Sequence, residues 1–135
     1  MRAIRTGILA ASAAVAAVVA AVPGTATAAS AAAPKVSCPS GYVCFYTGFN
    51  YTGSKCQWDV QDPDWTSGTY ACSWATTSNV KSVWNAGTDS SLTGVAYYLN
   101  KNYSNRVGCT RQGHGGNLQG TYKVLSHKWI DSSCG

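Results

Sequence analysis

The stretch Tyr46-Thr47-Gly48-Phe49-Asn50-Tyr51-Thr52-Gly53 places two tyrosines five positions apart and a glycine two positions after the second. The same spacing returns in residues 98–105, which begin with Tyr98, carry Tyr103 and end with Asn105. A backbone position that needs a positive φ is filled best by Gly and next best by Asn. The exchange of Gly53 for Asn105 therefore indicates that both stretches fold in the same way.

Further positions repeat in the same order after both stretches. A cysteine follows each tyrosine pair, and a Thr-x-x-Val-x-Ser pattern comes later in each half. These elements are Cys56 with Thr77–Ser82, and Cys109 with Thr121–Ser126. Such a repeat predicts two similar four-stranded units, at about residues 37–86 and 92–135, which pack together because neither buries a face alone.

Short apolar runs separated by Gly, Asn, Ser and Thr fill the chain after residue 36, without the apolar spacing of a helix. The predicted strands, rich in aromatic and β-branched residues, are 42–46, 82–84, 95–99, 122–125 and 128–130. Residues 59–68 carry three Asp, a Pro and a Gly, which predicts a loop. Many short strands predict an all-β sandwich or barrel.

Residues 1–28 have the features of a secretory signal peptide. Arg2 and Arg5 precede the apolar run Gly7–Ala21, and Pro23 follows it ahead of small residues. The run is shorter than the roughly twenty residues that cross a bilayer. We therefore expect secretion into the extracellular space, with no membrane attachment after cleavage. Residues 29–36 are expected to form a flexible tail, and residues 37–135 a single domain.

All six cysteines lie in the part of the chain that is expected to be exported. An even number of cysteines in a short secreted domain predicts three disulfides, for which many pairings are open. We predict pairing in chain order, which joins Cys38–Cys44, Cys56–Cys72 and Cys109–Cys134. Zinc sites need short paired spacings such as C-x-x-C, which this sequence lacks, so we expect no metal and no cofactor.

Charge and motifs argue against two classes of function. Without Arg2 and Arg5 the chain carries eight Lys or Arg against five Asp and no Glu, a net charge of 8 − 5 = +3. The cations are scattered, whereas a nucleic-acid-binding domain of this size normally shows a basic stripe. There is no G-x-S-x-G or H-E-x-x-H motif and there are only two His, so we do not expect an enzyme.

The repeated tyrosine pattern, with a later Ser82 or Ser126 in each half, resembles the folded hairpin of the βγ-crystallin-like fold. That resemblance implies a sandwich of two Greek-key motifs. Its calcium sites use paired acids, which Thr77–Ser82 and Thr121–Ser126 lack, so we expect no calcium. The opening Cys38-Pro39-Ser40-Gly41-Tyr42-Val43-Cys44-Phe45-Tyr46 is similar to the start of a family of small secreted bacterial metalloproteinase inhibitors.

This second resemblance implies a proteinaceous inhibitor whose partner is an extracellular protease, of the zinc metalloproteinase class, met by a rigid, substrate-like loop of the monomer. The matching stretch is Arg106–Arg111, and its contact residues would be Cys109, Thr110 and Arg111. Thr110 stands where the family has an apolar residue. His114 stands where the family has the cysteine that closes the loop.

Two other functions fit a secreted β domain of this kind. One is a killer-toxin-like or antifungal protein, because the resemblance in fold extends to such proteins. The other is a module that binds cell-wall polysaccharide through an exposed aromatic side chain. Trp65, in the acidic loop, is the aromatic residue that we expect to be exposed.

Overall fold

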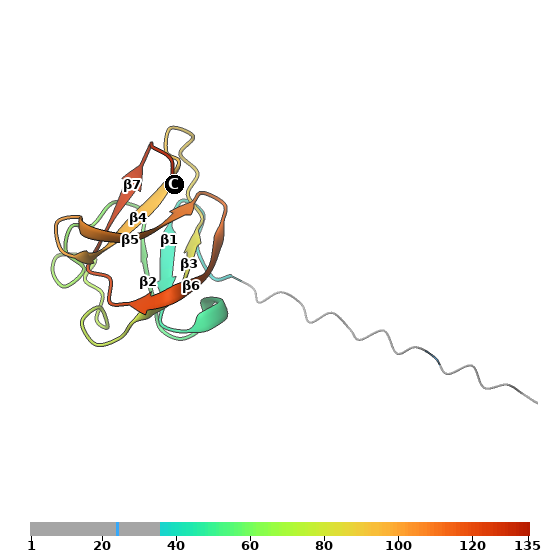
Figure 1. Cartoon of the computed structure of the whole chain (residues 1–135), viewed down its shortest axis with the longest axis horizontal. Helices are drawn as coiled ribbons and strands as arrows, with labels where there is room; N and C mark the ends of the chain where they lie inside the picture. Colours follow the sequence, from blue (N-terminus) through green and yellow to red (C-terminus); the bar gives the residue numbers. More distant parts are fainter. Residues whose placement is uncertain (1–23, 25–35) are drawn as a thin grey trace, which may run out of the picture. The chain divides into compact units, whose positions relative to one another are not determined.

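Two antiparallel sheets form the described part of the chain, which in this computed structural model is Gly24 and residues 36–135 (Figure 1). The predicted signal peptide (1–28) and tail (29–36) lie outside the described residues, apart from Gly24 and Val36. The elements are β1 (Val43–Tyr46), the 3-10 turn η1 (Phe49–Tyr51), β2 (Lys55–Trp58), β3 (Val80–Asn85), β4 (Gly94–Asn100), β5 (Ser104–Arg111), β6 (Gly115–Tyr122) and β7 (Ser126–Ile130).

The strand order interleaves the two halves of the chain. One sheet has the order β2-β1-β3-β6 and the other β5-β4-β7. The later strand β6 thus completes the sheet of the early strands, and Asp62 from the first half forms an isolated bridge with His127 in β7. The prediction of an all-β fold is confirmed. Within residues 36–135 there is no helix long and apolar enough to span a membrane.

The tyrosine hairpin of residues 46–53 has an unusual backbone. Asn50 and Tyr51 have φ values of 55° and 62°, and Gly53 has 80°. The Tyr51 N–H donates to Ser82 Oγ at 3.0 Å, and that hydroxyl donates to the Gly48 carbonyl at 2.6 Å. Ser82 is fully buried, so it closes the turn from inside the sheet.

The second half repeats each of these features. The φ values of Asn102, Tyr103 and Asn105 are 56°, 57° and 59°. The Tyr103 N–H donates to Ser126 Oγ at 3.1 Å, and Ser126 donates to the Asn100 carbonyl at 2.5 Å. Ring pairs Tyr46–Tyr51 and Tyr98–Tyr103 have centroid distances of 5.7 and 5.8 Å. The positive φ predicted at Gly53 and Asn105 is therefore confirmed.

Aromatic side chains fill the space between the sheets. Phe45 of β1 lies edge-on to Trp65 at 4.8 Å and to Tyr97 of β4 at 5.6 Å between ring centroids. Trp58 stacks on Trp65 at 4.3 Å. The expectation that Trp65 is exposed is wrong, because its side chain has 0 % exposure. A loop of turn-forming residues carries Trp65 back into the core, where a large ring gains most from burial.

The three disulfides join Cys38 to Cys44, Cys56 to Cys72 and Cys109 to Cys134. Each stays within one half of the chain. The first two lie before β4, whereas the third joins β5 to the segment that follows β7. The covalent links therefore do not connect the early strands with the late ones.

Candidate functional site

Strands β5 and β6 form an arch between the two sheets, which we call the β5–β6 arch (Ser104–Tyr122). Its first strand pairs with β4 in one sheet and its second strand with β3 in the other. The turn Gln112–His114 joins them, closed by the His114 N–H donating to the Arg111 carbonyl at 3.2 Å. Gly113 has a φ of 72°, which favours glycine at this tight corner.

The sequence-predicted contact residues lie at the end of β5, so the prediction that they form a loop is wrong. Thr110 pairs with Val95 of β4, and its side chain is only 8 % exposed. Gly108 resembles a loop residue in sequence, but a Cβ there would lie 2.3 Å from the Tyr97 ring. Glycine is required at this point because the strand passes directly over a buried tyrosine.

Cys109 and Arg111 point to the opposite face of β5 from Thr110, because side chains alternate along a strand. On that outer face the Cys109–Cys134 disulfide crosses Gly94, where a Cβ would lie 2.7 Å from the Cys134 sulfur. Arg106 Nη2 donates to the Cys134 carbonyl at 3.0 Å. The C-terminal segment therefore braces β5 from outside.

Asn85, the last residue of β3, holds the arch from inside. Its backbone N–H donates to the His114 carbonyl at 2.9 Å, and its carbonyl accepts from the Gly113 N–H at 2.8 Å. Its fully buried side-chain amide donates to the Thr110 carbonyl at 2.9 Å and accepts from the Gly87 N–H at 2.9 Å. Sequence reasoning missed this residue, because its partners in the arch lie more than 20 positions away and no local pattern marks them.

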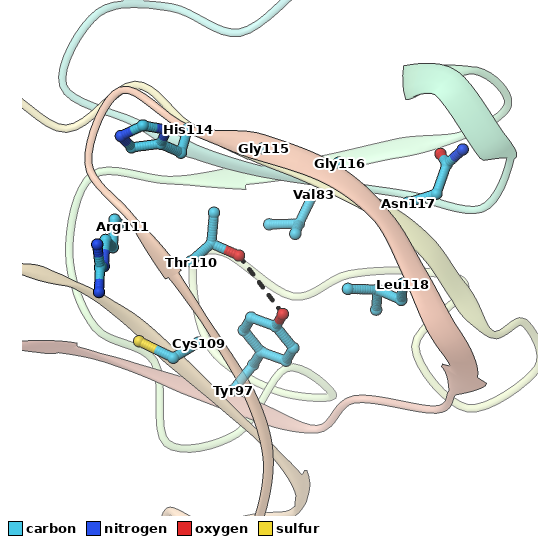
Figure 2. Close-up of a pocket in the computed structure, with 10 residues that line it drawn as sticks. All are labelled: Val83, Tyr97, Cys109, Thr110, Arg111, His114, Gly115, Gly116, Asn117 and Leu118. Atoms are coloured by element: carbon cyan, nitrogen blue, oxygen red, sulfur yellow. Dashed lines mark hydrogen bonds between the residues drawn. The ribbon is translucent and has the colours of Figure 1, made fainter. Parts of the chain in front are cut away.

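A groove of about 280 Å³ lies between the strands of the arch (Figure 2). Val83 and Leu118 supply apolar walls, and the hydroxyls of Thr110 and Tyr97 face each other at 3.4 Å between them. Burial raises the pKa of the Tyr97 phenol, so that group stays protonated at neutral pH. The groove therefore has apolar side chains on its walls and neutral hydroxyls at its base.

The residues that line the groove include a cation but no carboxylate. Arg111 and His114 stand at its turn end, with side chains that point away from its interior (Figure 2). Within residues 36–135 the carboxylate of Asp64 pairs with Lys101 at 3.2 Å, and Arg111 has no carboxylate partner. In the same residues no group of three or more His, Cys, Asp or Glu is placed to hold a metal ion.

His127 lies away from the groove, buried beside Trp65. The indole N–H of Trp65 donates to His127 Nδ1 at 2.8 Å, so the proton of the neutral ring is on Nε2, which donates to the Val60 carbonyl at 2.8 Å. Desolvation lowers the pKa of this imidazole to about 4. Both ring nitrogens serve to attach the loop of residues 59–79 to β7, which is a structural role.

The sequence matches one known protein family, a family of peptidase inhibitors. Residues 31–110 match the model of peptidase inhibitor family I36. The matched stretch is more than half of the 135 residues, and it ends at Thr110 within β5. No curated protein matches the chain.

Proposed function

The chain belongs to peptidase inhibitor family I36. We propose that it is secreted, that it binds an extracellular zinc metallopeptidase, and that it blocks this enzyme through the β5–β6 arch. The family supports a peptidase as the partner. The metallopeptidase class is supported by the resemblance of Cys38–Tyr46 and Arg106–Arg111 to secreted metalloproteinase inhibitors. Three disulfides support an extracellular location, because such bonds persist in oxidising compartments.

The observation that carries this proposal is the bracing of the arch on both sides. The Cys109–Cys134 disulfide fixes β5 from the outer face, and Asn85 ties Thr110 and the turn together from the inner face. A segment that is already ordered loses little conformational entropy on binding, so more of its contact energy appears as affinity. An inhibitor of this kind needs no catalytic group of its own.

The three residues Cys109, Thr110 and Arg111 contribute to this contact in different ways. Arg111 is exposed and presents the only charged side chain among the three. Cys109 positions the strand through its disulfide, and Thr110 keeps its side chain in the groove and not in the partner's specificity pocket. We therefore expect the inhibitory contact to come mainly from Arg111, the adjoining turn and the backbone of β5.

The test is a titration of the purified protein against a thermolysin-like zinc peptidase, a serine peptidase and a cysteine peptidase, each with a peptide substrate. We expect inhibition of the zinc peptidase, weakened about tenfold or more by Arg111→Ala, because arginines often dominate protein contacts. Lys123→Ala, which removes an exposed cation on the loop after β6, is the matched control and should inhibit normally.

The result separates two parts of the proposal. Inhibition of the serine or cysteine peptidase alone would show that the metallopeptidase class is wrong while an inhibitor remains. Absence of inhibition of all three peptidases at micromolar protein would contradict the inhibitory function itself.

A further inference from the structure

The groove in the β5–β6 arch exists because one strand position has no side chain. Gly116 pairs with Val83, and paired residues of antiparallel strands point to the same face of a sheet. A side chain at position 116 would therefore enter the groove. A Cβ built there has no atom within 4 Å, whereas a Cβ at Gly115 would lie 2.5 Å from the Trp84 ring.

The volume and walls of this space suit an apolar side chain from outside. The groove measures about 280 Å³ and is open to solvent, so its size does not prevent a leucine-sized side chain from entering. Val83 and Leu118 flank it, and both belong to or pack against the hydrophobic core. A leucine-sized side chain that moves from water into the groove would therefore contact Val83 and Leu118, which also contact core residues.

The strands beside the groove suit an extended peptide. Each is the edge of its sheet, β5 in one and β6 in the other, so each has a row of backbone groups without a neighbouring strand. Extended peptides bind such edges through main-chain hydrogen bonds and place alternate side chains in pockets. An apolar side chain in the groove would thus belong to a segment that runs along the arch.

Charge indicates which residues flank that apolar side chain. Residues 92–135 carry five Lys or Arg and one Asp, whereas residues 37–91 carry two Lys and four Asp. The turn end of the groove has Arg111, which has no carboxylate partner within the described residues. A segment with a carboxylate next to its apolar residue would place that carboxylate near the guanidinium.

We propose that the groove of the β5–β6 arch binds an extended, acidic surface segment of the partner peptidase, with one apolar side chain inserted beside Gly116 and a neighbouring carboxylate at Arg111. This proposal rests on the proposed function, which identifies the partner as a peptidase. It adds that the segment of the peptidase that is bound is acidic and carries an apolar side chain.

A direct test uses blocked peptides and the ¹⁵N-labelled full domain followed by NMR. The probe is acetyl-Asp-Leu-Asp-amide. The controls are the same peptide with Ser for Leu and the same peptide with Lys for both Asp. We expect saturable shifts of the Gly116, Leu118 and Arg111 amides with the first peptide. The Ser control should bind at least about tenfold more weakly, because it loses the apolar contact. The Lys control should bind at least about threefold more weakly, because an exposed charge pair is replaced by repulsion.

Gly116→Leu fills the groove from within and is the decisive variant. It is expected to fold, since the Cβ added at position 116 has no atom within 4 Å, and thermal unfolding checks this. Gln119→Leu adds the same side chain at an exposed position of β6 and is the matched control. Peptide shifts should be lost in Gly116→Leu, and peptidase inhibition should weaken about tenfold or more, while Gln119→Leu resembles wild type.

The outcomes distinguish this inference from the function on which it rests. Equal peptidase inhibition by wild type and folded Gly116→Leu would overturn the groove and leave the inhibitor intact. So would the lack of saturable shifts at millimolar peptide. Groove binding of the acidic peptide by a protein that inhibits no peptidase would support the groove and remove the proposed function.

Discussion

Asn105 and Gly53 show how one backbone requirement is met in two ways. Both have positive φ, but a Cβ at Gly53 would lie 2.5 Å from Thr47 Oγ1 and 3.0 Å from the Gly48 nitrogen. Asn105 is exposed and meets no such limit. Glycine is thus needed at 53 for space as well as for φ, whereas at 105 only the φ requirement applies.

We predict that Asn105→Ala destabilises the protein by about 1 kcal/mol, because alanine pays the steric cost of the left-handed region and asparagine tolerates it. Asn105→Gly should lie within about 0.5 kcal/mol of wild type, since glycine removes that cost but makes the unfolded chain more flexible. Urea unfolding measures the free energy of unfolding of both variants, and an unchanged dependence on urea concentration shows that only stability has changed. Equal stability of the Ala and Gly variants would contradict this account.

His127 gives the protein a sensitivity to mild acid. Its pKa is near 4 in the folded state and 6.5 when unfolded, so between these values only the unfolded chain binds a proton. Stability is therefore complete above about pH 6.5 and falls as the pH drops to 4, by roughly 3 kcal/mol. The lowered carboxyl pKa values of Asp64 and Asp89 act only below their ordinary value of 3.8, outside this window.

Urea unfolding at pH 7, 5.5 and 4.5 measures this loss, and an NMR titration assigns it. The ring resonances of His127 should stay in the neutral form down to about pH 4. His114→Gln should keep the full pH dependence, because His114 is exposed at the turn. A buried His127 that titrates near its ordinary pKa in the folded protein would rule the mechanism out.

The individual residues that can be identified from sequence are those with a local signature. The presence of Gly53 in one half and Asn105 in the other indicates a position that needs a positive φ. The repeated serine, Ser82 or Ser126, indicates a turn whose backbone is held by a hydroxyl group. Asn85 has no such signature, because its partners are set by how β3 meets the arch. The prediction for Trp65 is wrong for the same reason, since its burial depends on where the whole loop packs.

At the scale of elements, β3 depends on Asn85 to hold the arch in place. We predict that Asn85→Ala costs about 1–3 kcal/mol, because it leaves the Thr110 carbonyl and the Gly87 N–H without their partner in a buried site. Amide exchange at Gly113 should also quicken, since that N–H donates to the Asn85 carbonyl. Inhibition should weaken as the arch loosens.

Asn79→Ala is the control for this prediction, because its side-chain amide donates to Thr121 at a more exposed position. It should change stability by less than about 0.5 kcal/mol and leave Gly113 exchange unchanged. Similar losses in both variants would show that Asn85 has no special part in fixing the arch.

Three strands, β2, β5 and β6, are missed from sequence, and two of these are rich in glycine. Aromatic and β-branched runs predict β1, β3, β4 and β7 in outline. Strands β5 and β6 contain Gly108, Gly115, Gly116 and Gly120, which look like loop residues in sequence. The segment 122–125 is predicted as a strand, but only Tyr122 belongs to one. At Gly108, Gly115 and Gly120 glycine serves close packing against rings, which no local pattern reveals.

For the whole molecule, charge is distributed unevenly along the chain. Residues 92–135 carry 5 − 1 = +4 and residues 37–91 carry 2 − 4 = −2. Arg106 and Arg111 are both exposed on β5. Long-range attraction between these two arginines and an acidic peptidase would speed their encounter and would be screened by salt.

We predict that the association rate with an acidic peptidase falls by about tenfold or more between roughly 20 and 300 mM salt. The double variant Arg106→Gln, Arg111→Gln should flatten this dependence. Lys55→Gln with Lys81→Gln, which removes as much charge from the first half, should leave it steep. Stopped-flow measurement of the association rate compares the three proteins. An equal salt dependence in both double variants would argue against directed attraction.

The exchange of strands between the halves has a mechanical consequence. Two of the three disulfides lie within residues 38–72, before β4, and the third joins Cys109 of β5 to Cys134 after β7. A single cut of the backbone in the exposed residues 88–91 would therefore produce two pieces with no covalent link between them. The pieces would still be held together by the pairing of β6 with β3, the Asp62–His127 bridge and the shared hydrophobic core. Such pieces lend themselves to reconstitution from separately produced fragments, with inhibition restored only when both are present.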